Sequence, residues 1–80
     1  MLIRFKKDNK CVIYNTENII ALQIDCNEVA GKKTIDIVIT GNDGHHDYCP
    51  CSSLEQARKA LDKIYDTYAT GFQAITVEVD

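Results

Sequence analysis

The sequence predicts an α+β fold, in which an antiparallel sheet of five or six strands carries one amphipathic helix on one face, in the chain order five strands, helix, strand. Three observations predict it. Apolar and polar residues alternate through most of the chain, as they do in strands that are buried on one side. Residues 52–70 instead repeat their apolar residues with a helical period. The glycines and the lone proline fall where one element should give way to the next.

Chain length and composition indicate one globular domain over residues 1–80. A chain this short buries only about 60 to 65% of the surface that it exposes when unfolded, so it cannot build two cores. Its 45% hydrophobic and 26% charged residues are typical of a folded chain rather than a disordered one. The net charge of -3 includes no basic cluster, which argues against nucleic acids and membranes as partners.

The pattern of apolar segments favours a cytoplasmic protein. None approaches the roughly 20 apolar residues that span a bilayer, and the start, MLIRFKKDNK, lacks the apolar segment of a signal peptide. Cytoplasmic thiols stay reduced, so we expect Cys11, Cys26, Cys49 and Cys51 to be free, although their even number leaves a disulfide framework open.

The first two strands are short and form a hairpin. Residues 2–6 alternate, with Ile3 and Phe5 on one face. Residues 10–14 form the second strand after a tight turn. The cluster NTEN at residues 15–18 then suits a short connection, because its side chains compete for backbone hydrogen bonds.

The next three strands form two hairpins. In IIALQIDC, residues 19–26, one face is formed by Ile20, Leu22, Ile24 and Cys26. The hydrophilic segment NEVAGKK, residues 27–33, is the expected hairpin tip. In TIDIVIT, residues 34–40, one face is formed by Ile35, Ile37 and Ile39. The sequence GNDG, residues 41–44, predicts a second hairpin turn because Asn, Asp and Gly tolerate positive φ, and residues 45–51 are the returning strand.

The helix begins after Cys51, where Ser52 or Ser53 can be its N-cap, and ends near Gly71. Its apolar stripe, which should pack on the sheet, consists of Leu54, Ala57, Leu61, Ile64, Tyr65 and Tyr68. The two tyrosines are therefore expected in the core or at its rim. A last strand covers residues 72–79, and its pairing within the chain or with another copy stays open.

The sheet face without a helix is more apolar than a solvated face requires. It is expected to carry Val12, Tyr14, Val38 and Tyr48 among polar residues. This favours self-association through the uncovered face, against the alternative that scattered exposed apolar residues are ordinary.

Three short motifs resemble a known group of proteins: N-x-x-N-I at residues 15–19, the D-G turn at residues 43–44 and S-x-E-x-A at residues 53–57. The chain is similar to small uncharacterised proteins of Gram-positive bacteria and their phages, in which a β-meander precedes one helix. The resemblance implies the fold and a prophage or other mobile-element origin, but no activity and no site residues. The sequence departs from that group in the letters Cys-Pro-Cys of the returning strand.

The stretch HHDYCPC, residues 45–51, is the one candidate site. Strand alternation places His45, Asp47, Cys49 and Cys51 on one face and His46, Tyr48 and Pro50 on the other. Zinc could be held by Cys49 and Cys51 with His45 or His46, and with Cys26 or Cys11 from a neighbouring strand. Two cysteines separated by one residue in a strand lie about 6.5 to 7 Å from each other, so this site requires Pro50 to bend the chain.

The alternative interpretation treats HHDYCPC as an ordinary strand. Reduced cysteine behaves as a small apolar residue, so Cys49 or Cys51 fills the core, as do Cys11, in phase with Ile13, and Cys26, in phase with Ile24. A redox pair and a cysteine-dependent enzyme are weaker alternatives, and no catalytic residue or cofactor is predicted. We predict a non-enzymatic protein that acts by protein contact or self-association, with a zinc-binding domain as the alternative.

Overall fold

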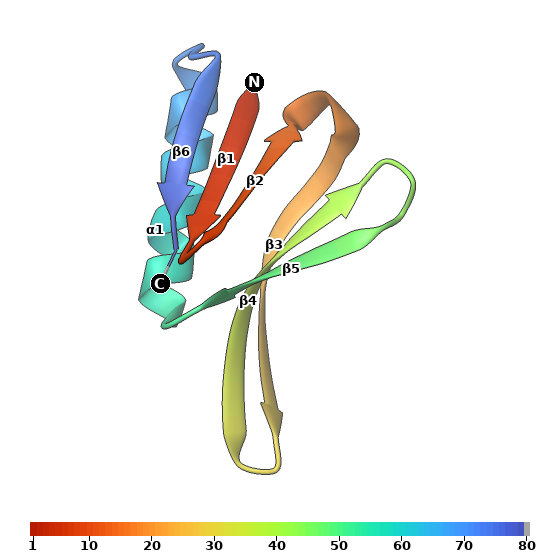
Figure 1. The fold of residues 1–80 in the computed structure, drawn as a ribbon, viewed down its shortest axis with the longest axis vertical. Coiled ribbons are helices and arrows are strands. Elements are labelled where there is room, and N and C mark those ends of the chain that lie inside the picture. The colour runs from red at the N-terminus through yellow and green to blue at the C-terminus, as the bar shows by residue number, and fades with distance from the viewer. Residues whose placement is uncertain (80) are drawn as a thin grey trace.

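Residues 1–79, which the computed structural model describes, form six strands and one helix (Figure 1). The elements are β1 (Leu2–Lys7), β2 (Lys10–Asn15), a 3-10 turn (Thr16–Asn18), β3 (Ile19–Val29), β4 (Lys32–Gly41), β5 (His46–Cys51), α1 (Leu54–Ala69) and β6 (Ala74–Glu78). The predicted α+β class and element order are confirmed. No helix among these residues has the length and hydrophobicity needed to cross a membrane.

The strands form two three-stranded sheets, so the prediction of a single sheet is wrong. The first sheet has the order β2-β1-β6, in which β6 runs parallel to β1 and pairs Ile75 with Ile3 and Val77 with Phe5. The last strand therefore pairs within the chain. The second sheet, β3-β4-β5, is antiparallel throughout.

The chain divides into two sheets at the 3-10 turn, where the Asn15 side chain accepts a hydrogen bond from the Glu17 backbone amide. One helix is about 10 Å wide and covers only about two strands, whereas six paired strands would span about 24 Å. A single sheet would leave much of its apolar face in water. Two sheets that face each other bury both apolar faces.

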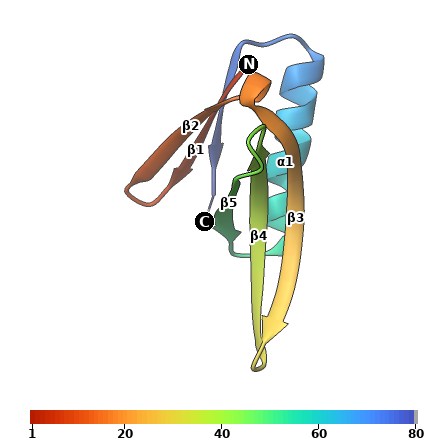
Figure 2. The same cartoon turned by 90° about the vertical axis from the view of Figure 1, so that its right-hand side faces the viewer.

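The core lies between the inner faces of the sheets and the helix, which packs against β6 and against β3, β4 and β5. Figure 2 shows α1 behind β3 and β4. The buried core residues are Ile3, Phe5, Ile37, Ile39, Ala57, Ala60, Ile64, Ile75, Val77 and Val79.

The inward side of the helix is narrower than its apolar stripe predicted. Ala57, Ala60 and Ile64 are buried, but Tyr65 and Tyr68 are 73% and 63% exposed, so their assignment to the core or its rim is wrong. The helix lies in the angle between two sheets, where its small residues allow close approach. The tyrosines lie on its flank, across a recess from β3, and neither sheet covers them.

The hairpin β1–β2 presents the opposite face from the one expected. Tyr14 pairs with Ile3, and its ring packs edge-on against Phe5 with centroids 5.8 Å apart, so Tyr14 and Val12 lie on the inner face of the first sheet. Val38 lies on the outer face of the second sheet but is only 2% exposed. Val12, Tyr14 and Val38 therefore do not form the uncovered apolar face that was predicted for them, because the two sheets share a core.

The hairpin β3–β4 is longer and tighter than expected. Its tip is the pair Ala30-Gly31, with φ of 54° and 77°, instead of the whole segment 27–33. The third strand, β5, pairs with β4 only as far as Ile35, so residues 27–34 form a two-stranded arm. Figure 1 shows this arm projecting from the body, and the molecule with its arm measures 42 × 26 × 24 Å along its principal axes.

A register shift in β3 makes one further prediction wrong, namely that Ile20 faces inward. Ile19 pairs with Gly41 and Ala21 with Thr40, which leaves Ile20 in a bulge. Ile20 is 66% exposed instead of facing inward with Leu22, and Ile19 packs against the core in its place.

Candidate functional site

The stretch HHDYCPC is a strand, as the preferred interpretation predicts. Residues 46–51 form β5, and the inner face of this strand carries Asp47, Cys49 and Cys51, which lie opposite Ile39, Ile37 and Ile35 of β4. Cys49 and Cys51 are half-buried and pack against the core, which confirms their expected role as apolar residues.

The other two cysteines do not fill the core. Cys11 is exposed in β2 opposite Lys6, because the hairpin β1–β2 turns the other face of β2 inward. Cys26 is exposed at the base of the arm. None of the four cysteines, all within the described residues, is in a disulfide.

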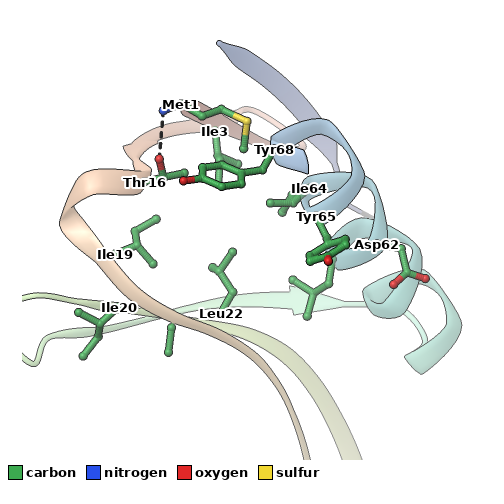
Figure 3. A pocket seen from close by; sticks show the side chains of 12 residues that line it. Met1, Ile3, Thr16, Ile19, Ile20, Leu22, Asp62, Ile64, Tyr65 and Tyr68 are labelled. Atoms are coloured by element: carbon green, nitrogen blue, oxygen red, sulfur yellow. Dashed lines mark hydrogen bonds between the residues drawn. The ribbon is translucent and has the colours of Figure 1, made fainter. Parts of the chain in front are cut away.

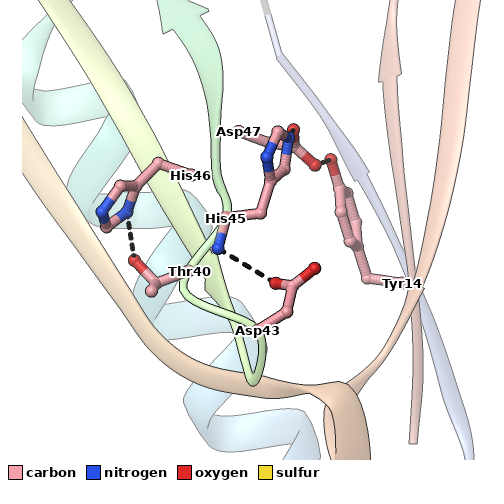
Figure 4. A network of polar contacts seen from close by, with 6 residues as sticks. All are labelled: Tyr14, Thr40, Asp43, His45, His46 and Asp47. Carbon is pink, nitrogen blue, oxygen red and sulfur yellow. Dashed lines mark hydrogen bonds and ion pairs between the residues drawn. The ribbon is translucent and has the colours of Figure 1, made fainter.

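A network of polar side chains joins the two sheets on the side opposite the helix (Figure 4). The Tyr14 hydroxyl donates a 2.9 Å hydrogen bond to Oδ2 of Asp47, whose Oδ1 lies 3.0 Å from Nε2 of His45. Nζ of Lys7 donates a 2.8 Å hydrogen bond to the carbonyl oxygen of Pro50 nearby. These contacts hold β1 and β2 of the first sheet to β5 of the second.

The ionisation of this network favours a structural role. Burial raises the pKa of Tyr14 to about 12, and the hydrogen bond and negative charge of Asp47 act in the same direction. The phenol therefore stays protonated near neutral pH and serves as a donor to Asp47. Burial likewise raises the pKa of the Cys49 and Cys51 thiols, which disfavours the thiolate that a nucleophile or redox site needs.

The side chains proposed as zinc ligands point to different partners. His46 lies on the outer face, with Nδ1 2.9 Å from the Thr40 hydroxyl, while His45 contacts Asp47. Cys26 and Cys51 lie on either side of Ile35 and are separated by two strand spacings, about 10 Å. Among residues 1–79, no group of three or more His, Cys, Asp or Glu side chains is arranged to hold a metal ion.

An apolar groove of about 480 Å³ lies between α1 and β3 (Figure 3). Its lining consists of Met1, Ile3, Thr16, Ile19, Ile20, Ala21, Leu22, Leu61, Asp62, Ile64, Tyr65 and Tyr68. At one end the amino-terminal nitrogen of Met1 donates a 3.0 Å hydrogen bond to the Thr16 hydroxyl. Ile19 and Leu22 are only partly buried, so the helix leaves part of the apolar face of β3 uncovered.

Sequence reasoning missed this groove, which is flanked by the exposed aromatic side chains of Tyr65 and Tyr68. The available signal was the pair Tyr65 and Tyr68. Tyrosine combines a large apolar ring with a polar tip and is enriched at protein interfaces, so tyrosines at the margin of a helical stripe can mark a contact surface.

A second recess, of about 430 Å³, lies between the hairpin β1–β2 and β5 on the opposite side of the molecule. Its lining includes Tyr14, Tyr48 and Cys49 together with Lys7 and Lys10. The hydrogen bond from Lys7 to Pro50 crosses between its two walls, which makes it a seam between the sheets rather than an open binding surface.

Comparison with known proteins finds no significant match among protein-family models, curated proteins or solved structures. The resemblance to small proteins of Gram-positive bacteria and their phages stays a prediction of the sequence.

Proposed function

We propose that this is a non-enzymatic protein that acts through protein contact, by self-association, with the groove between α1 and β3 as the interface. The observation that carries the proposal is the groove itself, an apolar recess flanked by the exposed side chains of Ile20, Tyr65 and Tyr68. Apolar and aromatic side chains gathered around one recess are typical of a docking surface.

The surface area of the chain supports a second copy as the occupant. The accessible surface is 5608 Å², whereas a compact monomer of 9.0 kDa exposes about 4,850 Å². The radius of gyration, 12.6 Å, exceeds the roughly 11.6 Å expected of a compact domain of this length. The surplus of about 750 Å² includes the exposed arm of residues 27–34, whose β3 strand a second copy would partly cover.

The chemistry of the HHDYCPC stretch supports a non-enzymatic role. Its carboxylate accepts a hydrogen bond from Tyr14, and its thiols have pKa values raised by burial. These side chains are engaged in packing and in joining the sheets. A cytoplasmic location and a prophage or mobile-element origin belong to the same proposal, supported by the four unpaired thiols and by the sequence resemblance respectively.

Sedimentation velocity from about 1 μM to 1 mM protein tests the proposal. We expect the mean mass to rise above 9.0 kDa towards twice that value. The variant Tyr65→Lys, Tyr68→Lys should associate at least about tenfold more weakly, because buried tyrosines commonly dominate interface energies. Ile13→Lys is the matched control, since Ile13 is exposed on the outer face of the first sheet.

Two results would contradict the proposal. A mass of 9.0 kDa at every concentration would exclude self-association in this range. Equal association of the wild type and the tyrosine variant would exclude the groove as the interface. Far-UV circular dichroism of each variant shows that it is folded.

A further inference from the structure

We infer that two copies join through β3, which pairs antiparallel with the β3 of the second copy about a two-fold axis at Ile24. The β3-β4-β5 sheets of the two copies then join into one six-stranded sheet. Its strand order is β5-β4-β3 in the first copy, followed by β3-β4-β5 in the second. This inference rests on the proposed self-association and specifies its geometry.

The free edge of β3 is the most open strand edge in the fold. β3 has eleven residues and pairs only with β4. Apart from the Ile19 amide, which donates to the Thr16 carbonyl, its amides and carbonyls have no other backbone partner among residues 1–79. An unpaired edge of this length is a ready template for another strand. By contrast, the edge strand β5 contains Pro50, which cannot donate to a ladder, and the edge strand β2 has only six residues.

Pairing of this kind brings the groove into the interface. A two-fold axis perpendicular to a sheet keeps the same face on the same side in both copies, so both helices lie on one side of the joined sheet. Residues 25–27 of each copy then lie beside residues 21–23 of the other. Cys26, at the base of each arm and on the inner face, thereby lies opposite Leu22 of the other copy, which lines the groove of that copy.

The side-chain charges and the overlap of the two β3 strands select the register in which the two copies pair. Residues 21–29 of β3 lie beyond the bulge at Ile20, and an axis at Ile24 pairs residues 21–27 next to the groove that residues 19–22 line. An axis at Asp25 would place two carboxylates directly opposite each other, which is unfavourable. With the axis at Ile24, Leu22 lies opposite the partner's Cys26 on the inner face, and Gln23 lies opposite the partner's Asp25 on the outer face.

Two substitutions of the exposed Gln23 test this register. Gln23→Lys places a cation opposite the partner's Asp25, and Gln23→Glu, the isosteric control, places an anion there. Each dimer contains two such pairs, so we expect Gln23→Lys to lower the dimer Kd and Gln23→Glu to raise it, each by about 2- to 30-fold. Sedimentation velocity gives Kd, and urea unfolding of each variant at low concentration gives the stability of the separate chain.

The pattern of outcomes separates the geometry from the function. Opposite shifts in Kd support the register. Weaker association in both variants would place Gln23 opposite itself and overturn the register. Unchanged Kd in both, with association still lost in Tyr65→Lys, Tyr68→Lys, would overturn pairing through β3 while the proposed function stands. A wild type that stays monomeric would overturn both.

Disulfide trapping provides a second measurement. Chains carrying Gln23→Cys and chains carrying Asp25→Cys are mixed, with Cys11 and Cys26 replaced by serine in both. Directly opposed residues of an antiparallel pair have Cα atoms about 4.5 to 5.5 Å apart, within the range of a disulfide. We expect the mixed disulfide to form faster than either homodimer, and dominance of the Asp25→Cys homodimer would contradict the register.

Discussion

Replacement of Tyr14 by phenylalanine tests whether the polar network holds the two sheets together. The substitution removes the hydroxyl that donates a 2.9 Å hydrogen bond to Asp47 and keeps the ring that packs against Phe5. Hydrogen bonds to charged groups contribute about 1.5 to 3 kcal/mol, and the half-buried position of Tyr14 favours the low end, about 1.5 kcal/mol. With a urea dependence near 1 kcal/mol per molar, the unfolding midpoint should fall by about 1.5 M.

The same variant makes a prediction about pH. The pKa of Tyr14 is about 12 in the folded chain and 10.0 when unperturbed, so the folded state holds the proton more tightly. The contribution of Tyr14 is therefore complete below pH 10 and is lost as pH rises towards 12. Between pH 9 and pH 11 the loss is at most about 1.3 kcal/mol, with solvent screening reducing it.

Urea unfolding of the wild type and Tyr14→Phe at pH 7, 9 and 11 measures both effects. We expect a gap of about 1.5 kcal/mol at pH 7 and 9 that nearly closes at pH 11. The matched control is Tyr48→Phe, because the Tyr48 hydroxyl has no hydrogen-bond partner among the described residues and the ring is exposed. Equal midpoints at pH 7, or a gap that persists unchanged at pH 11, would refute the reasoning.

Three further predictions concern the helix, the second sheet and the thiols. Ser53→Ala should lower the free energy of unfolding by about 1 kcal/mol, because the Ser53 hydroxyl accepts a hydrogen bond from the Gln56 amide and caps α1. Ser52→Ala should lower it by less, and equal losses of stability in thermal unfolding would contradict this. Asp36→Asn should raise the free energy of unfolding by about 0.2 to 1 kcal/mol, since the Asp25 carboxylate of β3 lies directly opposite. A gain in stability that survives in 1 M salt would have another cause. Protein purified without chelator should contain far less than one zinc ion per chain by plasma mass spectrometry, and near-stoichiometric zinc that disappears in Cys49→Ser, Cys51→Ser would revive the metal hypothesis.

The elements of this fold were predictable because each depends on local sequence. Alternation of apolar and polar residues identified the strands, and the serines before Leu54 located the start of the helix. The strand character of HHDYCPC and the half-burial of Cys49 and Cys51 followed from the same two-residue period.

Which apolar face points inward was not predictable strand by strand. Tyr14 and Ile13 are both suitable for a buried face, and only the pairing of β2 with β1 and the position of β5 select Tyr14. The exposure of Cys11 and Cys26 follows from the same choice of face and from the length of the arm. The network of Tyr14, Asp47 and His45 joins residues more than thirty positions apart, so no local pattern contains it.

The sequence by itself determined the α+β class, the order of the strands and the single helix, because side-chain period, turn residues and capping residues act over a few neighbouring positions. The tertiary structure decided the division into two sheets, the parallel pairing of β6 with β1 and the groove beside Tyr65 and Tyr68. These features depend on how much apolar face one helix can cover. That balance is a property of the assembled elements, and it becomes defined only when they pack together.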